Sequence, residues 1–170
     1  MSNKFPSLQT SRGALRWLWL SALAVVLDQI SKYLVVEHLK IHEPLALMPS
    51  LNLTLMYNPG AAFSFLSQAG GWQRWMFTGV AVLVSVVIVF WLARLPGRKH
   101  WEAAALALIL GGALGNVIDR IRLGHVIDFI QVYYHDWFFP AFNVADSAIT
   151  LGVILLLFDA IVKPGGKSGL

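Results

Sequence analysis

Four apolar stretches, each close to the length of a membrane-spanning helix, constrain the fold of this chain more than any other feature. A helix needs roughly 17 to 25 mostly apolar residues to cross the hydrocarbon core of a bilayer. The composition agrees, because 57% of the 170 residues are hydrophobic and only 13% carry a charge. A soluble domain of this size cannot bury that much apolar surface. The sequence therefore predicts an integral membrane protein that is mainly α-helical, built as a bundle of four transmembrane helices.

The predicted spans form a single membrane domain over residues 1–170 and leave two longer segments between them. The spans cover about residues 15–36, 75–93, 101–118 and 144–162, and the two segments cover about residues 37–73 and 119–143. The first span is also compatible with a cleavable signal peptide, since a basic flank precedes it. We interpret it as retained, because it is too long for that role and contains Asp28 and Lys32.

The basic residues predict which ends of the spans face the cytoplasm, because Lys and Arg are enriched in cytoplasmic loops. They lie before the first span, between the second and third, and after the fourth: Lys4, Arg12, Arg16, Arg94, Arg98, Lys99, Lys163 and Lys167. Both termini are therefore expected in the cytoplasm, with segments 37–73 and 119–143 outside. The bias is moderate, since the outer segments also contain bases. Because the bases lie at span ends and form no stripe, no nucleic-acid partner is expected.

The outer segments contain strand patterns. Residues 51–57 alternate apolar and polar side chains, which is typical of a half-buried strand, and the apolar run 61–66 follows them. Residues 128–134 are rich in β-branched and aromatic side chains, which favour strands. We therefore expect a small β-sheet on the outer membrane surface, with the aromatic stretch 137–140 dipping into the interface.

Polar side chains occur inside or at the ends of these apolar stretches, where each costs a few kcal/mol or more and is a functional candidate by default. Asp28 lies twelve positions beyond Arg16. At about 1.5 Å per residue this is roughly 18 Å into a core of about 30 Å, in its outer half. Asn116 lies at a similar depth in its span, Asp146 begins the last span, Asp128 follows the third span after a short turn, and Asn58 ends a predicted strand. Polar groups from five separate places are thus expected at one depth.

Two of these residues, Asp128 and Asp146, are candidates for a catalytic pair. Carboxyl groups held close together share one proton, because both cannot ionise cheaply at short range. The ionised group can deprotonate a water while the protonated group polarises a carbonyl, as in aspartic proteases.

The chain has no cysteine, which excludes thiolate catalysis and cysteine-ligated metal. The His42-Glu43 pair lacks the second histidine of a zinc-protease motif. Neither a metal nor a cofactor is expected.

Each candidate also has a purely structural interpretation. Asp28 and Lys32 are four residues apart and are compatible with a simple internal ion pair. Asn143 and Asp146 have the spacing of a helix-capping box. His125 is expected to be structural. Close helix packing is the expected role of three glycines in the third span: Gly111, Gly112 and Gly115.

Taken in order, the polar motifs resemble those of the lipoprotein signal peptidase family (signal peptidase II), which are bacterial inner-membrane aspartic proteases. The resemblance covers nearly the whole chain, and five blocks in the family's order are more specific than any one of them. The blocks are Asp28-Gln29 with Lys32, YNPGAAFS (57–64), GALGN (112–116) with Asp119-Arg120, VIDF (126–129) and FNVADS (142–147).

The resemblance implies removal of the signal peptide from diacylglyceryl-modified prolipoproteins, by cleavage just before the lipidated cysteine. It assigns Asp128 and Asp146 to the catalytic pair, on the periplasmic side of the inner membrane, with both termini cytoplasmic. It also implies binding of membrane lipid and of the cyclic peptide globomycin, and the chain is expected to be a monomer. Supporting or substrate-binding roles are implied for Asp28, Lys32, Asn58, Gly60, Asn116, Asp119, Arg120 and Asn143.

The residues alone do not exclude two other classes of protein. A small proton-coupled transporter, working as a dimer, would depend on Asp28 in the first span, and Asp128 would be replaceable. A structural subunit of a membrane complex would depend on no single aspartate. The long outer segments favour the peptidase, because a minimal transporter needs only short loops.

Overall fold

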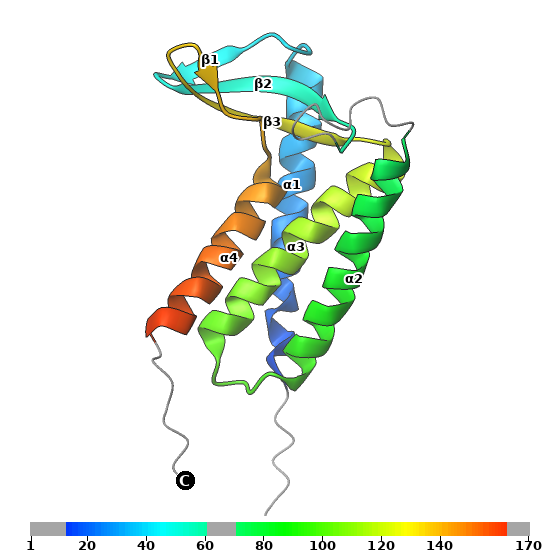
Figure 1. The fold of residues 1–170 in the computed structure, drawn as a ribbon, viewed down its shortest axis with the longest axis vertical. Coiled ribbons are helices and arrows are strands. Elements are labelled where there is room, and N and C mark those ends of the chain that lie inside the picture. The colour runs from blue at the N-terminus through cyan, green and yellow to red at the C-terminus, as the bar shows by residue number, and fades with distance from the viewer. Residues whose placement is uncertain (1–12, 61–70, 163–170) are drawn as a thin grey trace, which may run out of the picture.

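The computed structural model describes residues 13–60 and 71–162, so the predictions for run 61–66 and for both ends of the chain lie outside the described residues. Four helices form an elongated bundle (Figure 1), and each is long and apolar enough to cross a membrane. They are α1 (Leu18–His38), α2 (Trp72–Arg94), α3 (His100–Arg122) and α4 (Val144–Val162), with a 3-10 turn, η1 (Ala14–Trp17), before α1. The prediction of a four-helix membrane bundle is confirmed.

Helix α3 is the centre of the bundle and packs against α1, α2 and α4. Its glycines permit this close approach, since a Cβ added to Gly111 would lie 2.7 Å from the carbonyl oxygen of Ser21 in α1. A Cβ added to Gly112 would overlap the carbonyl oxygen of Ala145 in α4. Small residues at helix interfaces are the usual basis of packing inside membranes. The predicted packing role of these glycines is confirmed.

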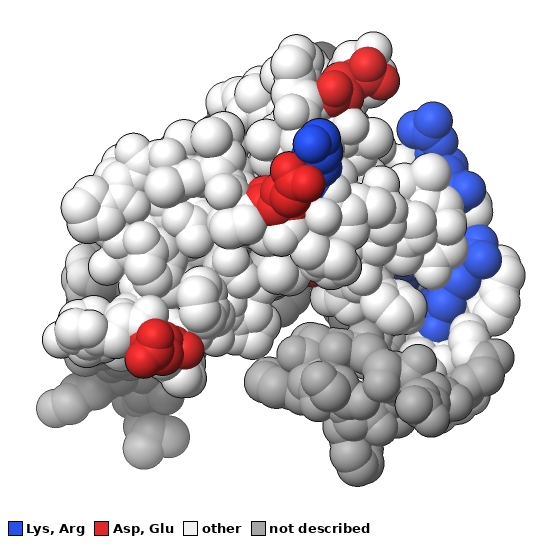
Figure 2. Space-filling view, turned by 90° about the horizontal axis from the view of Figure 1, so that it is seen from above, with Lys and Arg blue, Asp and Glu red and all other residues white. Residues whose placement is uncertain are grey.

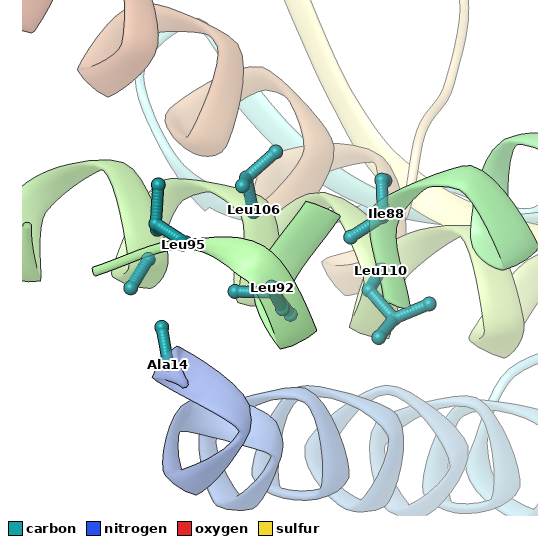
Figure 3. Close-up of a cluster of buried hydrophobic side chains, with 7 residues drawn as sticks. Ala14, Ile88, Leu92, Leu95, Leu106 and Leu110 are labelled. Carbon is teal, nitrogen blue, oxygen red and sulfur yellow. The ribbon is translucent and has the colours of Figure 1, made fainter. Parts of the chain in front are cut away.

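A hydrophobic cluster closes the end of the bundle that lies away from the sheet (Figure 3). Ala14 of η1 packs there with Leu92 and Leu95, at the end of α2, and with Leu106 of α3. Many other apolar side chains of α1, α2 and α4 are exposed on the outside of the bundle. This distribution suits helices surrounded by lipid tails, which are as apolar as leucine.

A four-stranded antiparallel sheet covers the other end of the bundle (Figure 1). In spatial order its strands are β1 (Leu45–Met48), β2 (Leu51–Asn58), β3 (Val126–Tyr134) and β4 (Trp137–Phe138). The predicted strands at 51–57 and 128–134 correspond to β2 and β3. The two edge strands escaped prediction, because β1 is exposed on both faces and shows no alternation, and β4 has only two residues.

The sheet is held to the bundle by apolar contacts and by the turn after α3. Leu55 of β2 and Phe129 of β3 are buried in one cluster with Val35 of α1. Helix α3 continues to Arg122, about one turn beyond the expected end of its span, and basic side chains there favour the helix terminus. Gly124, with a φ of 87°, then turns the chain into β3.

Candidate active site

The polar positions predicted to converge do meet, where the sheet joins the helices. Asp28 lies on α1, Asn116 on α3 and Asp146 in the first turn of α4, while Asn58 ends β2 and Asp128 lies on β3. Hydrogen bonds and ion pairs connect all five through two further residues of the predicted set, Lys32 and Asn143.

Asn143 links the two candidate catalytic aspartates. Its Nδ2 donates a hydrogen bond to Oδ1 of Asp128 at 2.7 Å, and its Oδ1 accepts one from the backbone N–H of Asp146 at 2.9 Å. The backbone N–H of Asn143 in turn donates to Oδ2 of Asp146 at 3.3 Å. This reciprocal pair is a capping box at the start of α4, so that structural interpretation is confirmed. The cap fixes Asp146 beside Asp128.

Two more amide side chains hold the carboxylates. Nδ2 of Asn116 donates to Oδ1 of Asp146 at 2.7 Å, and Nδ2 of Asn58 donates to Oδ2 of Asp128 at 3.0 Å. Gly60, with a φ of 100°, donates its N–H to Oδ1 of Asn58 at 2.9 Å and so orients that amide. All four carboxylate oxygens of the aspartate pair therefore accept a hydrogen bond.

The environment of Asp128 favours its protonated form. Burial is the main cause that raises the pKa of Asp128 from 3.8 to about 6, and the charge of Asp146 acts in the same direction. Hydrogen bonds from Asn58 and Asn143, and the charge of Lys32, oppose this rise. Two interacting carboxyl groups titrate as a pair, so the site is suited to hold one shared proton near pH 6.

A buried ionic cluster lies next to the pair. Nζ of Lys32 is 2.8 Å from Oδ2 of Asp28 and 2.7 Å from Oδ2 of Asp119, and it donates to Oδ1 of Asn116 at 3.1 Å. Lys32 is 2% exposed and Asp28 is 0% exposed. Buried charges are tolerated only when they are paired and hydrogen-bonded. The predicted Asp28–Lys32 ion pair is confirmed, and Asp119 extends it to α3.

Gln29 also belongs to this cluster; it is part of the Asp28-Gln29 block, but no role was predicted for it. Its Nε2 donates to Oδ1 of Asp119 at 2.9 Å, to Oδ2 of Asp28 at 3.2 Å and to the carbonyl oxygen of Gly115 at 3.3 Å. Its position in the sequence could have predicted this, because Gln29 is a second polar side chain beside Asp28 in an apolar span.

Arg120 lies at the edge of the site, with its guanidinium carbon 5.7 Å from the centre of the Phe77 ring. Within residues 13–60 and 71–162 it makes no ion pair with Asp119, which pairs with Lys32 instead. Its charge interacts with the aspartate pair and with Asp119. Among the described residues, Asp119 is therefore neutralised by Lys32 and not by the adjacent Arg120.

His125 takes no part in the network of aspartates and amides found in the described residues. Its ring centre lies 4.3 Å from that of Tyr57, and this contact fixes the turn before β3 against β2. Burial lowers the pKa of the His125 imidazole, which favours its neutral form. These contacts agree with the structural role predicted for it.

A cleft of about 360 Å³ opens beside the catalytic candidates. Asp128 and Asn58 line its polar side, while Phe138, Phe139 and Pro140 line its apolar side. Seen from above the sheet (Figure 2), most of this end of the molecule is uncharged, and basic side chains gather along one edge. The cleft can therefore hold an uncharged, extended segment against a carboxyl group.

The fold and the site together define a class of protein: a four-helix membrane protein with two carboxyl groups linked through one asparagine, one of them lining a cleft, at one end of the bundle. In the described part of the chain, no group of three or more His, Asp or Glu side chains is arranged to hold a metal ion.

Residues 20–162 match the family described as signal peptidase (SPase) II. A lipoprotein signal peptidase from Acinetobacter baumannii is 62% identical over 143 residues, which cover 84% of this chain and 81% of that protein. One from Pseudomonas syringae pv. tomato is 56% identical over 152 residues, 88% of each chain. A bacterial membrane enzyme solved by the in meso method at 2.3 Å resolution is 30% identical, with a TM-score of 0.79 over 91% of this chain and 93% of that one. The chain belongs to the signal peptidase II family.

Membership of this family decides between the three classes that the residues left open. It makes the chain a protease and leaves the transporter and structural-subunit hypotheses without support. The contacts of Asp28 agree, because its carboxylate is fully buried and held by Lys32 and by the backbone N–H of Ala145. A transporter would need that group to exchange protons with water.

Proposed function

We propose that this chain is an aspartic endopeptidase that removes the signal peptide from diacylglyceryl-modified prolipoproteins, cutting just before the lipidated cysteine. The name shared by its relatives, lipoprotein signal peptidase, supports this class of substrate. One observation supports the catalytic type: Asn143 binds two carboxyl groups from different elements, that of Asp128 through its side-chain Nδ2 and that of Asp146 through its backbone N–H.

The proposed reaction uses the pair as base and acid in turn. The ionised carboxylate accepts a proton from a water, whose oxygen attacks the scissile carbonyl carbon, while the protonated carboxyl gives its proton to the carbonyl oxygen. In the resulting gem-diol the two groups have exchanged protonation states. The newly protonated carboxyl then protonates the leaving nitrogen as the C–N bond breaks. The other carboxylate takes the proton of one hydroxyl while the second hydroxyl stays in the new carboxyl terminus, which restores the starting state.

The neutral amides fit this cycle, because either carboxyl must change its charge without losing its position. Asn58, Asn116 and Asn143 hold the carboxylates with hydrogen bonds and add no charge of their own. Arg120 is proposed to face the substrate, since its charge lies near the pair and it makes no ion pair within the described part of the chain. The aromatic wall of the cleft would cover the peptide while its acyl chains stay in lipid.

Charge and topology support an orientation in the membrane. The first and last described residues lie at the end of the bundle opposite to the sheet (Figure 1), and so does the basic α2–α3 connection with Arg98 and Lys99. Under the positive-inside rule this end is cytoplasmic, which supports a periplasmic active site in the bacterial inner membrane. The described network is complete within one chain, so the proposed site needs no residue of a second copy, and we propose that the protein acts as a monomer. Globomycin-type cyclic peptides are proposed to bind the same cleft.

The substrate assignment is tested by a gel-shift cleavage assay with purified enzyme in liposomes. The substrate is a prolipoprotein that carries diacylglyceryl on its cysteine, and the control is the same polypeptide without the lipid. We expect cleavage of the lipidated form only, because the acyl chains hold the scissile bond at the depth of the pair. Equal cleavage of both forms would contradict the proposed specificity, and cleavage of neither would contradict the proposed activity.

The dependence of activity on pH should report the pKa of Asp128. The pair must hold one proton, so kcat/KM is expected to fall as the pH rises above about 6. Asn58→Ala removes a hydrogen bond that stabilises ionised Asp128. The pKa of Asp128 should therefore rise, and the alkaline limb of the kcat/KM profile should move up by about one unit.

A matched control for this shift is Thr54→Val, which breaks the hydrogen bond between Thr54 and Gln131 on the same two strands without touching Asp128. Its alkaline limb should stay at the wild-type position. An Asn58→Ala limb that does not move, or that moves to lower pH, would show that this amide does not control the titration.

A further inference from the structure

Lys32 is a buried lysine whose partners bind the backbone next to both candidate catalytic aspartates. Nζ of Lys32 binds Oδ2 of Asp28 at 2.8 Å and Oδ2 of Asp119 at 2.7 Å. These partners belong to different helices, α1 and α3. The side chains of all three residues are no more than 3% exposed, so water does not compete for these contacts.

Each of the two carboxylates also holds the backbone N–H of the residue directly before a catalytic aspartate. Oδ1 of Asp28 accepts a hydrogen bond from Ala145 at 2.9 Å, and Asp146 is the next residue. Oδ2 of Asp119 accepts one from Ile127 at 3.2 Å, and Asp128 is the next residue. The N–H of Ala145 is in the first turn of α4, where the helix itself offers no acceptor. The two contacts therefore attach α4 and β3 to a single ammonium group.

The third donor of the lysine completes this arrangement. Nζ donates to Oδ1 of Asn116 at 3.1 Å, and Nδ2 of Asn116 donates to Oδ1 of Asp146 at 2.7 Å. An ammonium group has three donors and all three are used, in a geometry that neither a planar guanidinium nor a neutral side chain reproduces. A simple ion pair between two helices would need only one of these three N–H donors.

We infer that Lys32 is a positioning residue that fixes the separation of the Asp128 and Asp146 carboxyl groups, through the backbone contacts of Asp28 and Asp119 and the side chain of Asn116. The inference rests on the proposed function, because it concerns the pair to which catalysis is assigned there. Catalysis is sensitive to such spacing, since a misplacement of about 1 Å can lower a rate about 100-fold.

Amide hydrogen exchange provides the first test and needs no substrate. In the 15N-labelled wild-type protein in micelles, the amide protons of Ala145 and Ile127 should exchange slowly. In folded Lys32→Met both should exchange at least about tenfold faster, while amides in the middle of α4 keep their rates. A wild-type Ala145 amide that exchanges as fast as an unprotected N-terminal helix amide would overturn the inference, whatever the variants do.

Kinetics provide the second test, with Ser21→Ala as the matched control. Oγ of Ser21 donates to the carbonyl oxygen of Ala107 at 2.7 Å, so Ser21→Ala removes another buried contact between α1 and α3, away from the pair. We expect Lys32→Met to lower kcat per folded molecule about 10- to 100-fold, with KM nearly unchanged. Ser21→Ala should lower Tm and leave kcat unchanged. If Lys32 were purely structural, Lys32→Met would lower Tm and leave kcat unchanged, as expected for Ser21→Ala.

Lys32→Met leaves two buried carboxylates without a counter-ion and so risks misfolding. The triple variant Asp28→Asn, Lys32→Met, Asp119→Asn removes all three charges and is expected to fold, while it still lacks the ammonium bridge. It should show the same loss of kcat. A kcat within about twofold of wild type in either folded variant would overturn the inference. Failure of the proposed function would look different, because wild type itself would then not cut the lipidated substrate.

Discussion

Asp128→Asn and Asp146→Asn are each expected to abolish cleavage, with a loss of about 10⁴-fold in kcat. An amide can neither accept a proton from the attacking water nor supply one to the carbonyl oxygen. The substitution keeps the size of the side chain and one oxygen acceptor. The N-terminus of α4 should also survive in Asp146→Asn, because its cap is the side chain of Asn143. Both variants should therefore fold with a Tm near that of wild type.

The measurement is the gel-shift assay with lipidated substrate, run beside Asp136→Asn as a matched control. Asp136 is an exposed acid in the turn between β3 and β4, so the same chemical change there should leave turnover at the wild-type level. If Asp146→Asn keeps near-normal turnover, Asp146 is only part of a helix cap and the proposed pair is wrong. The same result for Asp128→Asn would reduce that residue to a structural hydrogen-bond acceptor.

Gly112→Ala is expected to destabilise the protein by about 3 kcal/mol and to lower activity with it. The added methyl group would overlap the carbonyl oxygen of Ala145 in α4. That oxygen belongs to the backbone, so no change of side-chain rotamer relieves the clash and α4 must move away from α3. Asp146 is the next residue after Ala145, so its carboxyl group would move as well.

Gly79→Ala is the matched control for this prediction. Gly79 lies inside α2, and a Cβ added there meets no atom within 4 Å. The substitution should be neutral or should stabilise α2 by up to about 1 kcal/mol, since alanine is the better helix former. Thermal unfolding of the purified variants in detergent measures both effects. Equal stability of Gly112→Ala and Gly79→Ala would show that α3 and α4 do not pack as closely as described.

The helices and the location of the site could be predicted because they depend on local properties of the sequence. The length of each apolar run predicts a span, and the position of Asp28 or Asn116 within its run predicts a depth. The Asn143–Asp146 spacing likewise predicts the capping box at the start of α4. Each of these patterns lies within a few turns of a single helix.

Partner choice between distant segments could not be predicted in this way. Both Asp28 and Asp119 were candidates, but nothing local shows that one lysine binds both carboxylates. Gln29 was missed for the same reason, since its partners at Gly115 and Asp119 lie on another helix. Strand β1 was missed because its side chains are exposed on both faces, so burial imposes no pattern on its sequence.

The distribution of the network along the chain also determines when the enzyme can become active during its synthesis. Asp28 and Lys32 leave the ribosome early, whereas Asn143 and Asp146 belong to the last helix. Until that helix enters the membrane, Asp128 lacks the amide donor of Asn143 and has no second carboxyl group. A nascent chain that has inserted only three helices would therefore lack the proposed catalytic pair. With that pair as the catalytic site, proteolysis would begin only after the fourth helix has entered the membrane.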